Sequence, residues 1–138
     1  MRAYVDTNIL VDLVCSREPF LQAAQRLFAE CVVGNIDLSV SALSFVNTVY
    51  IGRKYGYTDI KEKLYQLSQF LDVVDLKGKT VIEALNSSWK DYEDAVQSGS
   101  AMNVCADCIV TRNKKDFSGA VIPVYTVDEL FESLYKHS

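Results

Sequence analysis

Apolar residues occur along the chain both in short runs and at helical spacing. After Pro19, apolar side chains recur at intervals of three and four residues: Phe20, Ala23, Ala24, Leu27, Phe28, Cys31 and Val32. This spacing puts them on one face of an amphipathic helix, which Gly34 ends. Residues 3–5 instead form a short apolar run that stops at Asp6, a pattern typical of a buried strand.

The same periodicity predicts strands that alternate with helices. The expected strands cover residues 3–5, 36–40, 73–74, 109–110 and 121–125. Helices are expected from Asn8, from Pro19 to Gly34, from Ser41 to Arg53, from Thr58, and over residues 79–89, 91–103 and 127–136. No tight hairpin signal joins two strands, so the strands should be parallel and covered by helices on both faces. The sequence therefore predicts an α/β fold with three α/β/α layers, in which residues 1–138 form one domain.

The composition indicates a globular chain without a membrane segment. Hydrophobic residues make up 49% of the 138 residues and are spread along the chain, so a sizeable core can form. No apolar run approaches the roughly 18 residues that a membrane-spanning helix needs. The first carboxylate, Asp6, comes too early for a secretory signal. A cytoplasmic protein is expected.

The charge limits the kind of nucleic-acid contact that the chain can make. A net charge of −4 argues against a broad electrostatic surface for nucleic acid. A metal ion would add local positive charge that this count omits, so a nucleic-acid substrate stays compatible with it. Two short basic clusters are present, Arg53 with Lys54 and Arg112 with Lys114 and Lys115. Clusters of this size usually belong to the solvated surface.

The cysteines have both a chemical and a structural interpretation. Cys105 and Cys108 have the CxxC spacing of some zinc and redox sites. No second CxxC or Cys/His pair accompanies them, and the only histidine is His137. A redox CxxC should open a helix after a strand, whereas this one leads into a predicted strand. Buried structural thiols are therefore expected.

Open parallel sheets form their ligand sites outside the carboxyl ends of the strands, and polar residues here follow the predicted strands or open the neighbouring helices. They fall into four groups: Asp6, Thr7 and Asn8; Ser41, Ser44 and Asn47; Asp91, Glu93 and Asp94; and Thr111, Asn113 and Asp116. All four groups should face one edge of the sheet. Taken singly, each carboxylate also has a structural explanation, as a helix N-terminal residue for Asp6, Asp91 and Asp94 or as a turn residue for Asp116.

The convergence of these carboxylates favours a metal site. Carboxylates gathered at one edge repel each other unless a cation neutralises them. An all-oxygen ligand set suits Mg²⁺ or Mn²⁺ rather than zinc, and such ions support in-line phosphoryl displacement in many nucleases. The chain has neither a Gly-rich phosphate loop nor a candidate catalytic histidine. Metal-assisted hydrolysis is the chemistry that the pattern favours.

Several segments, in order, resemble the PIN domain family, which includes the VapC-type toxin ribonucleases. They are Asp6-Thr7-Asn8 after the first strand, Ser41-Ala42-Leu43-Ser44, and residues 91–97 and 106–117. The similarity covers essentially the whole chain. It implies a five-stranded parallel sheet in the order 3-2-1-4-5 and Mg²⁺- or Mn²⁺-dependent cleavage of RNA. It also implies an antitoxin protein and a second copy of the chain, as a homodimer, among the partners.

The resemblance carries over residue by residue. Asp6, Asp94 and Asp116 match the acidic positions of the family, which bind the metal and are catalytic. The expected supporting residues are Asn8, Ser41, Asn47, Asp91, Thr111 and Asn113. Basic residues that flank the last acid are expected to contact the RNA backbone: Arg112, Lys114 and Lys115.

Asn47 departs from the family pattern. It stands where the helix after the second strand usually carries a glutamate. An amide can coordinate a metal through its carbonyl oxygen but brings no charge, so the metal affinity and the activity depend on whether Asp91 or Glu93 supplies the missing charge.

Three classes of function compete. The first is an active PIN ribonuclease, a toxin that an antitoxin neutralises. The second is a PIN-like domain that binds RNA or a protein without cleavage, which Asn47 favours. The third, a phosphatase of the haloacid dehalogenase type, would also begin with an aspartate after a strand. It needs a second aspartate where Asn8 stands, and we rank it last.

Overall fold

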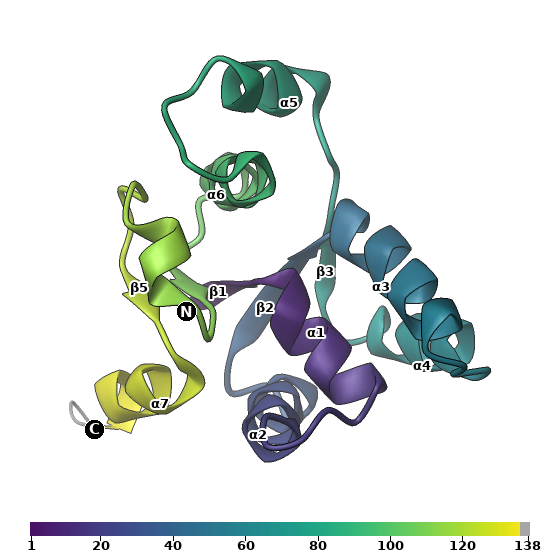
Figure 1. Ribbon diagram of the computed structural model, residues 1–138. Helices are drawn as coiled ribbons and strands as arrows, with labels where there is room; N and C mark the ends of the chain where they lie inside the picture. Colours follow the sequence, from purple (N-terminus) through teal and green to yellow (C-terminus); the bar gives the residue numbers. More distant parts are fainter. Residues whose placement is uncertain (136–138) are drawn as a thin grey trace.

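Five parallel strands form one sheet at the centre of the computed structural model, which describes residues 1–135 (Figure 1). The strands are β1 (Arg2–Val5), β2 (Asp37–Ser41), β3 (Asp72–Val74), β4 (Cys108–Val110) and β5 (Val124–Tyr125). Their order is β3-β2-β1-β4-β5, and every pairing is parallel. The predicted α/β fold and strand order are confirmed.

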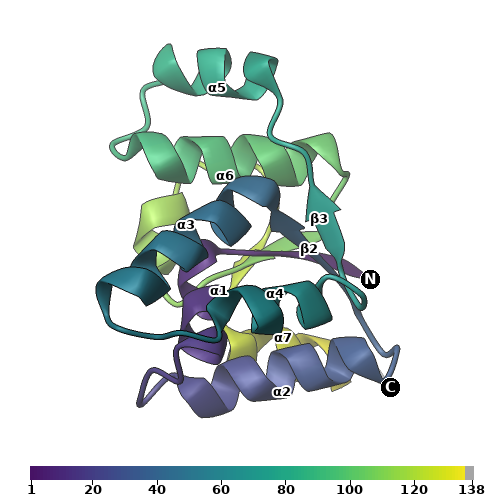
Figure 2. The ribbon, with the colours of Figure 1, turned by 90° about the vertical axis from the view of Figure 1, so that its right-hand side faces the viewer.

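Helices connect successive strands and cover both faces of the sheet. They are α1 (Thr7–Val14), α2 (Leu21–Val32), α3 (Ala42–Lys54), α4 (Ile60–Leu67), α5 (Gly78–Leu85), α6 (Tyr92–Asn103) and α7 (Val127–Tyr135), with a short 3-10 helix, η1 (Lys114–Phe117). Helix α5 lies outside α6, away from the sheet (Figures 1 and 2). The two helices approach closely because Gly99 has no side chain: a Cβ there would lie 2.7 Å from Thr80 Cγ2.

Strand β1 shows how the apolar run produces this layering. It lies between β2 and β4, and Ala3, Tyr4 and Val5 are fully buried. Because successive strand side chains point to opposite faces, Ala3 and Val5 join the core under α1, α2 and α7, whereas Tyr4 joins the smaller core under α6. A run that is apolar at every position is what a strand covered on both faces requires.

A buried polar network links the elements behind the carboxyl edge of β1. The Tyr4 hydroxyl donates to Gln97 Oε1, and Gln97 Nε2 donates to Thr7 Oγ1 at 3.1 Å and to Ser44 Oγ at 3.3 Å. Thr7 Oγ1 and Ser44 Oγ are 2.6 Å apart. Since a buried polar group is costly without a partner, this network fixes α1, α3 and α6 relative to one another.

Some predicted boundaries differ from the structure. The helix expected over residues 79–89 ends at Leu85, where Ser87 Oγ donates to the Ala84 carbonyl at 2.8 Å. The strand expected over residues 121–125 is reduced to Val124–Tyr125, and η1 was not predicted. The helix expected over residues 127–136 is α7, which the structure describes from Val127 to Tyr135. Residue 136 and His137 lie outside the described residues.

The cysteines are structural with one exception. Cys15, Cys31 and Cys108 are buried, as predicted, and Cys108 opens β4. Cys105 is exposed, and the expectation of a buried thiol is wrong there. Cys105 has a φ of 52°, so it forms the left-handed turn between α6 and β4 rather than part of either element. Within residues 1–135, no helix is both long and apolar enough to cross a membrane.

Candidate functional site

Asp6 stands at the carboxyl end of β1, in the N-cap position of α1. Its side chain is buried, and Oδ2 accepts a hydrogen bond of 2.9 Å from the Thr111 hydroxyl. The Asn113 backbone N–H donates to the same hydroxyl at 3.1 Å. Burial raises the pKa of Asp6, the Thr111 hydrogen bond opposes this, and the charge of Glu93 adds to it. The carboxylate is therefore held in one position in a setting that disfavours its charge.

Asp94 lies in the first turn of α6. Its backbone N–H donates to Asp91 Oδ1 at 3.0 Å, so Asp91 is the N-cap of this helix. The pKa of Asp94 is raised to about 7, first by burial and then by the charges of four neighbouring carboxylates: Asp91, Asp6, Asp116 and Glu93. Because these negative charges repel one another, the site disfavours ionisation of Asp94 and would gain from a cation that offsets them.

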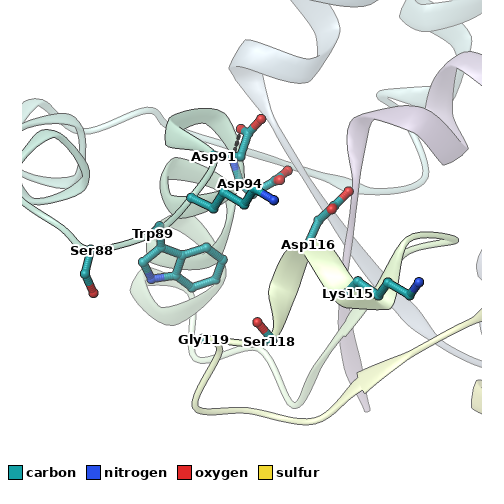
Figure 3. Close-up of a pocket in the computed structure, with 9 residues that line it drawn as sticks. Ser88, Trp89, Asp91, Asp94, Lys115, Asp116, Ser118 and Gly119 are labelled. Carbon is teal, nitrogen blue, oxygen red and sulfur yellow. Dashed lines mark hydrogen bonds between the residues drawn. The ribbon is translucent and has the colours of Figure 1, made fainter.

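These carboxylates surround one pocket of about 540 Å³ at the carboxyl edge of the sheet. Its polar lining includes five acidic residues and two amides: Asp6, Asp91, Glu93, Asp94 and Asp116, with Asn8 and Asn47. Figure 3 shows Asp91, Asp94 and Asp116 side by side at the start of α6 and on η1. The structure thus places Asp6, Asp94 and Asp116, from three separate segments, around the same space.

The donor set fits a hydrated divalent ion. In the part of the chain that the structure describes, no three acidic, histidine or cysteine side chains are close enough to enclose an ion by themselves. Mg²⁺ usually keeps several water ligands and takes only one or two carboxylates from the protein. A wide pocket lined by carboxylate and amide oxygens therefore suits Mg²⁺ or Mn²⁺. Metals that prefer thiolate or imidazole ligands would fit it less well.

Two of the expected supporting residues make hydrogen bonds within the local backbone structure. Ser41 is buried, caps α3 by accepting a 3.1 Å hydrogen bond from the Leu43 N–H, and does not line the acidic pocket. Its hydroxyl acts in the cap of the helix that it begins. Asn113 acts through its backbone N–H on Thr111. Asn47 is half-buried and lines the pocket, so α3 does face the site.

The three basic residues expected to contact RNA have different surroundings. Arg112 donates from Nε to Asp12 Oδ2 at 2.8 Å. Its guanidinium carbon lies over the Phe20 ring, 3.8 Å from the ring centroid. Lys114 Nζ lies 3.0 Å from Glu129 Oε2. Lys115 lines a pocket together with Asp91, Asp94 and Asp116. Of the three, Lys115 is best placed to contact a phosphate, because Arg112 is held by an intramolecular carboxylate.

Asp12 and Gln97 are site-supporting residues that the sequence did not reveal. Asp12 is buried and binds both Arg17 and Arg112, each through a 2.8 Å contact. This pairing ties α1, which follows Asp6, to the loop that leads from β4 to η1, on which Asp116 stands. A charged residue among the apolar positions of a short helix is a signal that a partner must exist, but it does not identify the partner.

A family model described as a PIN domain matches residues 2–115. The chain belongs to the PIN domain family. The match includes Asp6, Asp94 and the loop up to Lys115, and it ends one residue before Asp116. No curated protein sequence is similar enough to this PIN domain to count as a match.

Solved structures share the fold of this PIN domain at low sequence identity. A toxin–antitoxin complex from Klebsiella pneumoniae contains a chain that is 22% identical, with a TM-score of 0.66 over 91% of this chain and 97% of the other. VapC20 of Mycobacterium tuberculosis, described as a sarcin–ricin loop cleaving toxin, is 14% identical, with a TM-score of 0.64 over 78% and 86%. VapBC2 of Rickettsia felis, bound to promoter DNA, is 18% identical, with a TM-score of 0.63 over 91% and 97%.

Asp94→Asn should stabilise this PIN domain at high pH in the absence of divalent metal. The pKa of Asp94 is raised from 3.8 to about 7 in the folded state. The folded chain therefore holds more protons than the unfolded chain in this window, and wild-type stability falls as the pH rises through it. The variant lacks this loss, so its advantage in free energy of unfolding should grow from near zero below about pH 4 to its full value above about pH 7.

Urea denaturation in chelator across this pH range measures the effect. Glu62→Gln, at an exposed position on α4, is the matched control and should show no such pH dependence. An Asp94→Asn advantage that is the same at every pH would mean that ionisation of the buried Asp94 is not its cause.

Proposed function

We propose that this PIN domain is a metal-dependent endoribonuclease that hydrolyses phosphodiester bonds in RNA. The observation that supports this most is the shared pocket of Asp6, Asp94 and Asp116, in which the pKa of Asp94 is raised to about 7. Nucleases of this family generally use divalent metal ions. The carboxylate oxygens that repel one another are also the oxygens that would bind the metal, so a bound ion would offset their repulsion.

Asp6, Asp94 and Asp116 would hold the ion, in part through its water ligands, and Asn47 and Asp91 line the same pocket. When bound, Mg²⁺ or Mn²⁺ supplies Lewis-acid stabilisation for an in-line phosphoryl displacement.

The remaining residues position these ligands and the substrate. Thr111 fixes the Asp6 carboxylate by a 2.9 Å hydrogen bond, and Asp91 begins the helix on which Asp94 stands. The Lys115 ammonium group can bind a phosphate of the strand beside the pocket, as lysines do in nucleic-acid sites.

An antitoxin protein that controls this activity is part of the same proposal. The structural neighbours from Klebsiella pneumoniae and Rickettsia felis come from toxin–antitoxin complexes, and VapC20 is described as a toxin that cleaves the sarcin–ricin loop. The proposal also includes a cytoplasmic location, where the protein would meet its RNA substrate. It further includes assembly as a homodimer.

A second function is favoured by Asn47. Where the family usually has a glutamate, this half-buried amide lines the pocket and adds no negative charge. If the remaining carboxylates do not hold the ion in a productive position, the domain binds RNA or a protein without cleaving.

Purified protein with Mn²⁺ or Mg²⁺ should cut single-stranded RNA, and chelator should abolish cleavage. Asp6→Asn and Asp116→Asn should each lower the rate by about 100-fold or more, because removing a ligand weakens charge stabilisation that is worth several kcal/mol in the transition state. Gel analysis of labelled RNA measures this. Asp37→Asn, at the opposite end of the sheet at the start of β2, is the control and should cut like wild type. RNA binding without metal-dependent fragments would instead support the binder.

Asn47→Glu should tighten Mn²⁺ binding, and Asp91→Asn should weaken it. The first change adds a carboxylate to the pocket wall. The second removes a charge but keeps a side-chain oxygen that can still accept the Asp94 N–H bond, so the helix cap is preserved. Isothermal titration of the wild type and the two variants measures the charge effect, and each variant should change the affinity by about tenfold, or about 1.4 kcal/mol. Unchanged affinity in Asn47→Glu would show that residue 47 does not face the ion.

A further inference from the structure

A second pocket adjoins the acidic one. It has a volume of about 630 Å³, within the roughly 300–1,000 Å³ typical of ligand sites. The two pockets share Asp91, Asp94 and Asp116 as lining residues. A polymer whose backbone crosses the acidic pocket would therefore lead directly into the second one.

Trp89 forms one wall of this second pocket, in the loop that precedes α6 (Figure 3). Its indole is held edge-to-face against Phe117, with ring centroids 6.2 Å apart and planes at 77°. The side chain is only half-buried, and it borders the pocket as well as the core. A large aromatic ring is thus held rigidly beside the carboxylates.

Gly119 lets the chain after η1 pack closely against this ring. A Cβ at Gly119 would lie 3.1 Å from Trp89 Cε2 and 3.2 Å from Cζ2. The glycine lies below the indole, next to Ser118, where the pocket continues (Figure 3). A larger residue would therefore press on the indole and shift it from this position.

The charges around the pocket suit a nucleic-acid strand. Lys90 and Lys115 both line it, and neither forms an ion pair within residues 1–135. Figure 3 shows Asp94 and Asp116 between Trp89 on one side and Lys115 on the other. Aromatic rings that stack bases beside cations that bind phosphates are the usual components of single-strand binding sites.

We infer that Trp89 is the stacking platform for an unpaired RNA base next to the phosphate that lies over Asp6, Asp94 and Asp116. The inference rests on the proposed nuclease function and names its substrate class, single-stranded RNA. In a duplex both faces of each base are covered by neighbouring bases, so the indole has no face to contact. Lys115 binds the backbone on the opposite side of the carboxylates, which sets the direction in which the strand crosses the pocket.

Trp89 is the only tryptophan in the chain, so its fluorescence reports on this pocket alone. The experiment uses Asp6→Asn protein, because under the proposed function this substitution slows cleavage. In Mg²⁺ buffer the protein is titrated with a single-stranded RNA oligonucleotide and with the same sequence as a duplex. Fluorescence anisotropy of labelled RNA gives the binding curve in parallel. The single strand should quench Trp89 with the same midpoint as binding, and the duplex should leave Trp89 unquenched.

Variants separate stacking from a purely structural role of the tryptophan. Trp89→Leu should weaken single-strand binding about tenfold or more, since stacking on an aromatic ring contributes that much per base. Gly119→Ala should also weaken binding and reduce the quenching, although Trp89 remains. Lys115→Gln should weaken it severalfold, whereas Lys79→Gln on α5, the matched control, should not. Thermal unfolding of each variant checks that the fold is intact.

The outcomes distinguish the inference from the proposed function. If wild type cleaves RNA but bound RNA leaves Trp89 fluorescence unchanged, or if the duplex quenches equally, the stacking site is overturned and the nuclease stands. If Gly119→Ala, correctly folded, binds and quenches like wild type, the position of the indole does not matter for binding and the inference fails. If the RNA is neither bound nor cut, the proposed function and the stacking site both fail.

Discussion

Repulsion among carboxylates at one edge of the sheet is the constraint that the other features of this domain accommodate. Asp6 ends the central strand and is buried, while Asp94 begins a helix that approaches the same edge. Burial and neighbouring charges raise the pKa values of both groups. Left alone, such an arrangement opposes folding, so it persists only where the rest of the structure stabilises it and where a cation can offset the charge.

The surrounding contacts show how the fold withstands this repulsion. The network of Tyr4, Gln97, Thr7 and Ser44 joins β1, α1, α3 and α6 just behind the acidic edge. On the other side, the buried Asp12 binds Arg112 and so ties α1 to the loop after β4. The acids are therefore mounted on elements that are cross-linked to each other, which is the rigidity that a catalytic constellation needs.

The sequence predicted the parts of the structure that depend on local patterning. The all-apolar run of β1 required a strand covered on both faces, and the acids that follow strands had to meet at one edge because all strands run in the same direction. The spacing of α2 likewise predicted its buried stripe. For these elements the tertiary environment agrees with the local pattern.

Features that depend on a distant partner could not be predicted. Ser41 ends β2 and Thr111 follows β4. Ser41 caps α3, whereas Thr111 orients Asp6. Arg112 and Lys115 are three residues apart in one basic cluster, but only Arg112 meets the buried Asp12. Cys105 and Cys108 share a motif, and a left-handed turn exposes the first. In each case the side chain's role is decided by tertiary contacts that periodicity does not encode.

An anomalous difference map from crystals grown with Mn²⁺ tests most directly whether this edge is a metal site. A peak should appear in the acidic pocket, with carboxylate oxygens of at least two of Asp6, Asp94 and Asp116 at roughly 2.0–2.2 Å, typical for small divalent ions bound by oxygen. The peak should be absent in Asp6→Asn crystals. Ordered Mn²⁺ only at other surface positions, with the pocket carboxylates bound to water alone, would contradict a metal-dependent site at this edge.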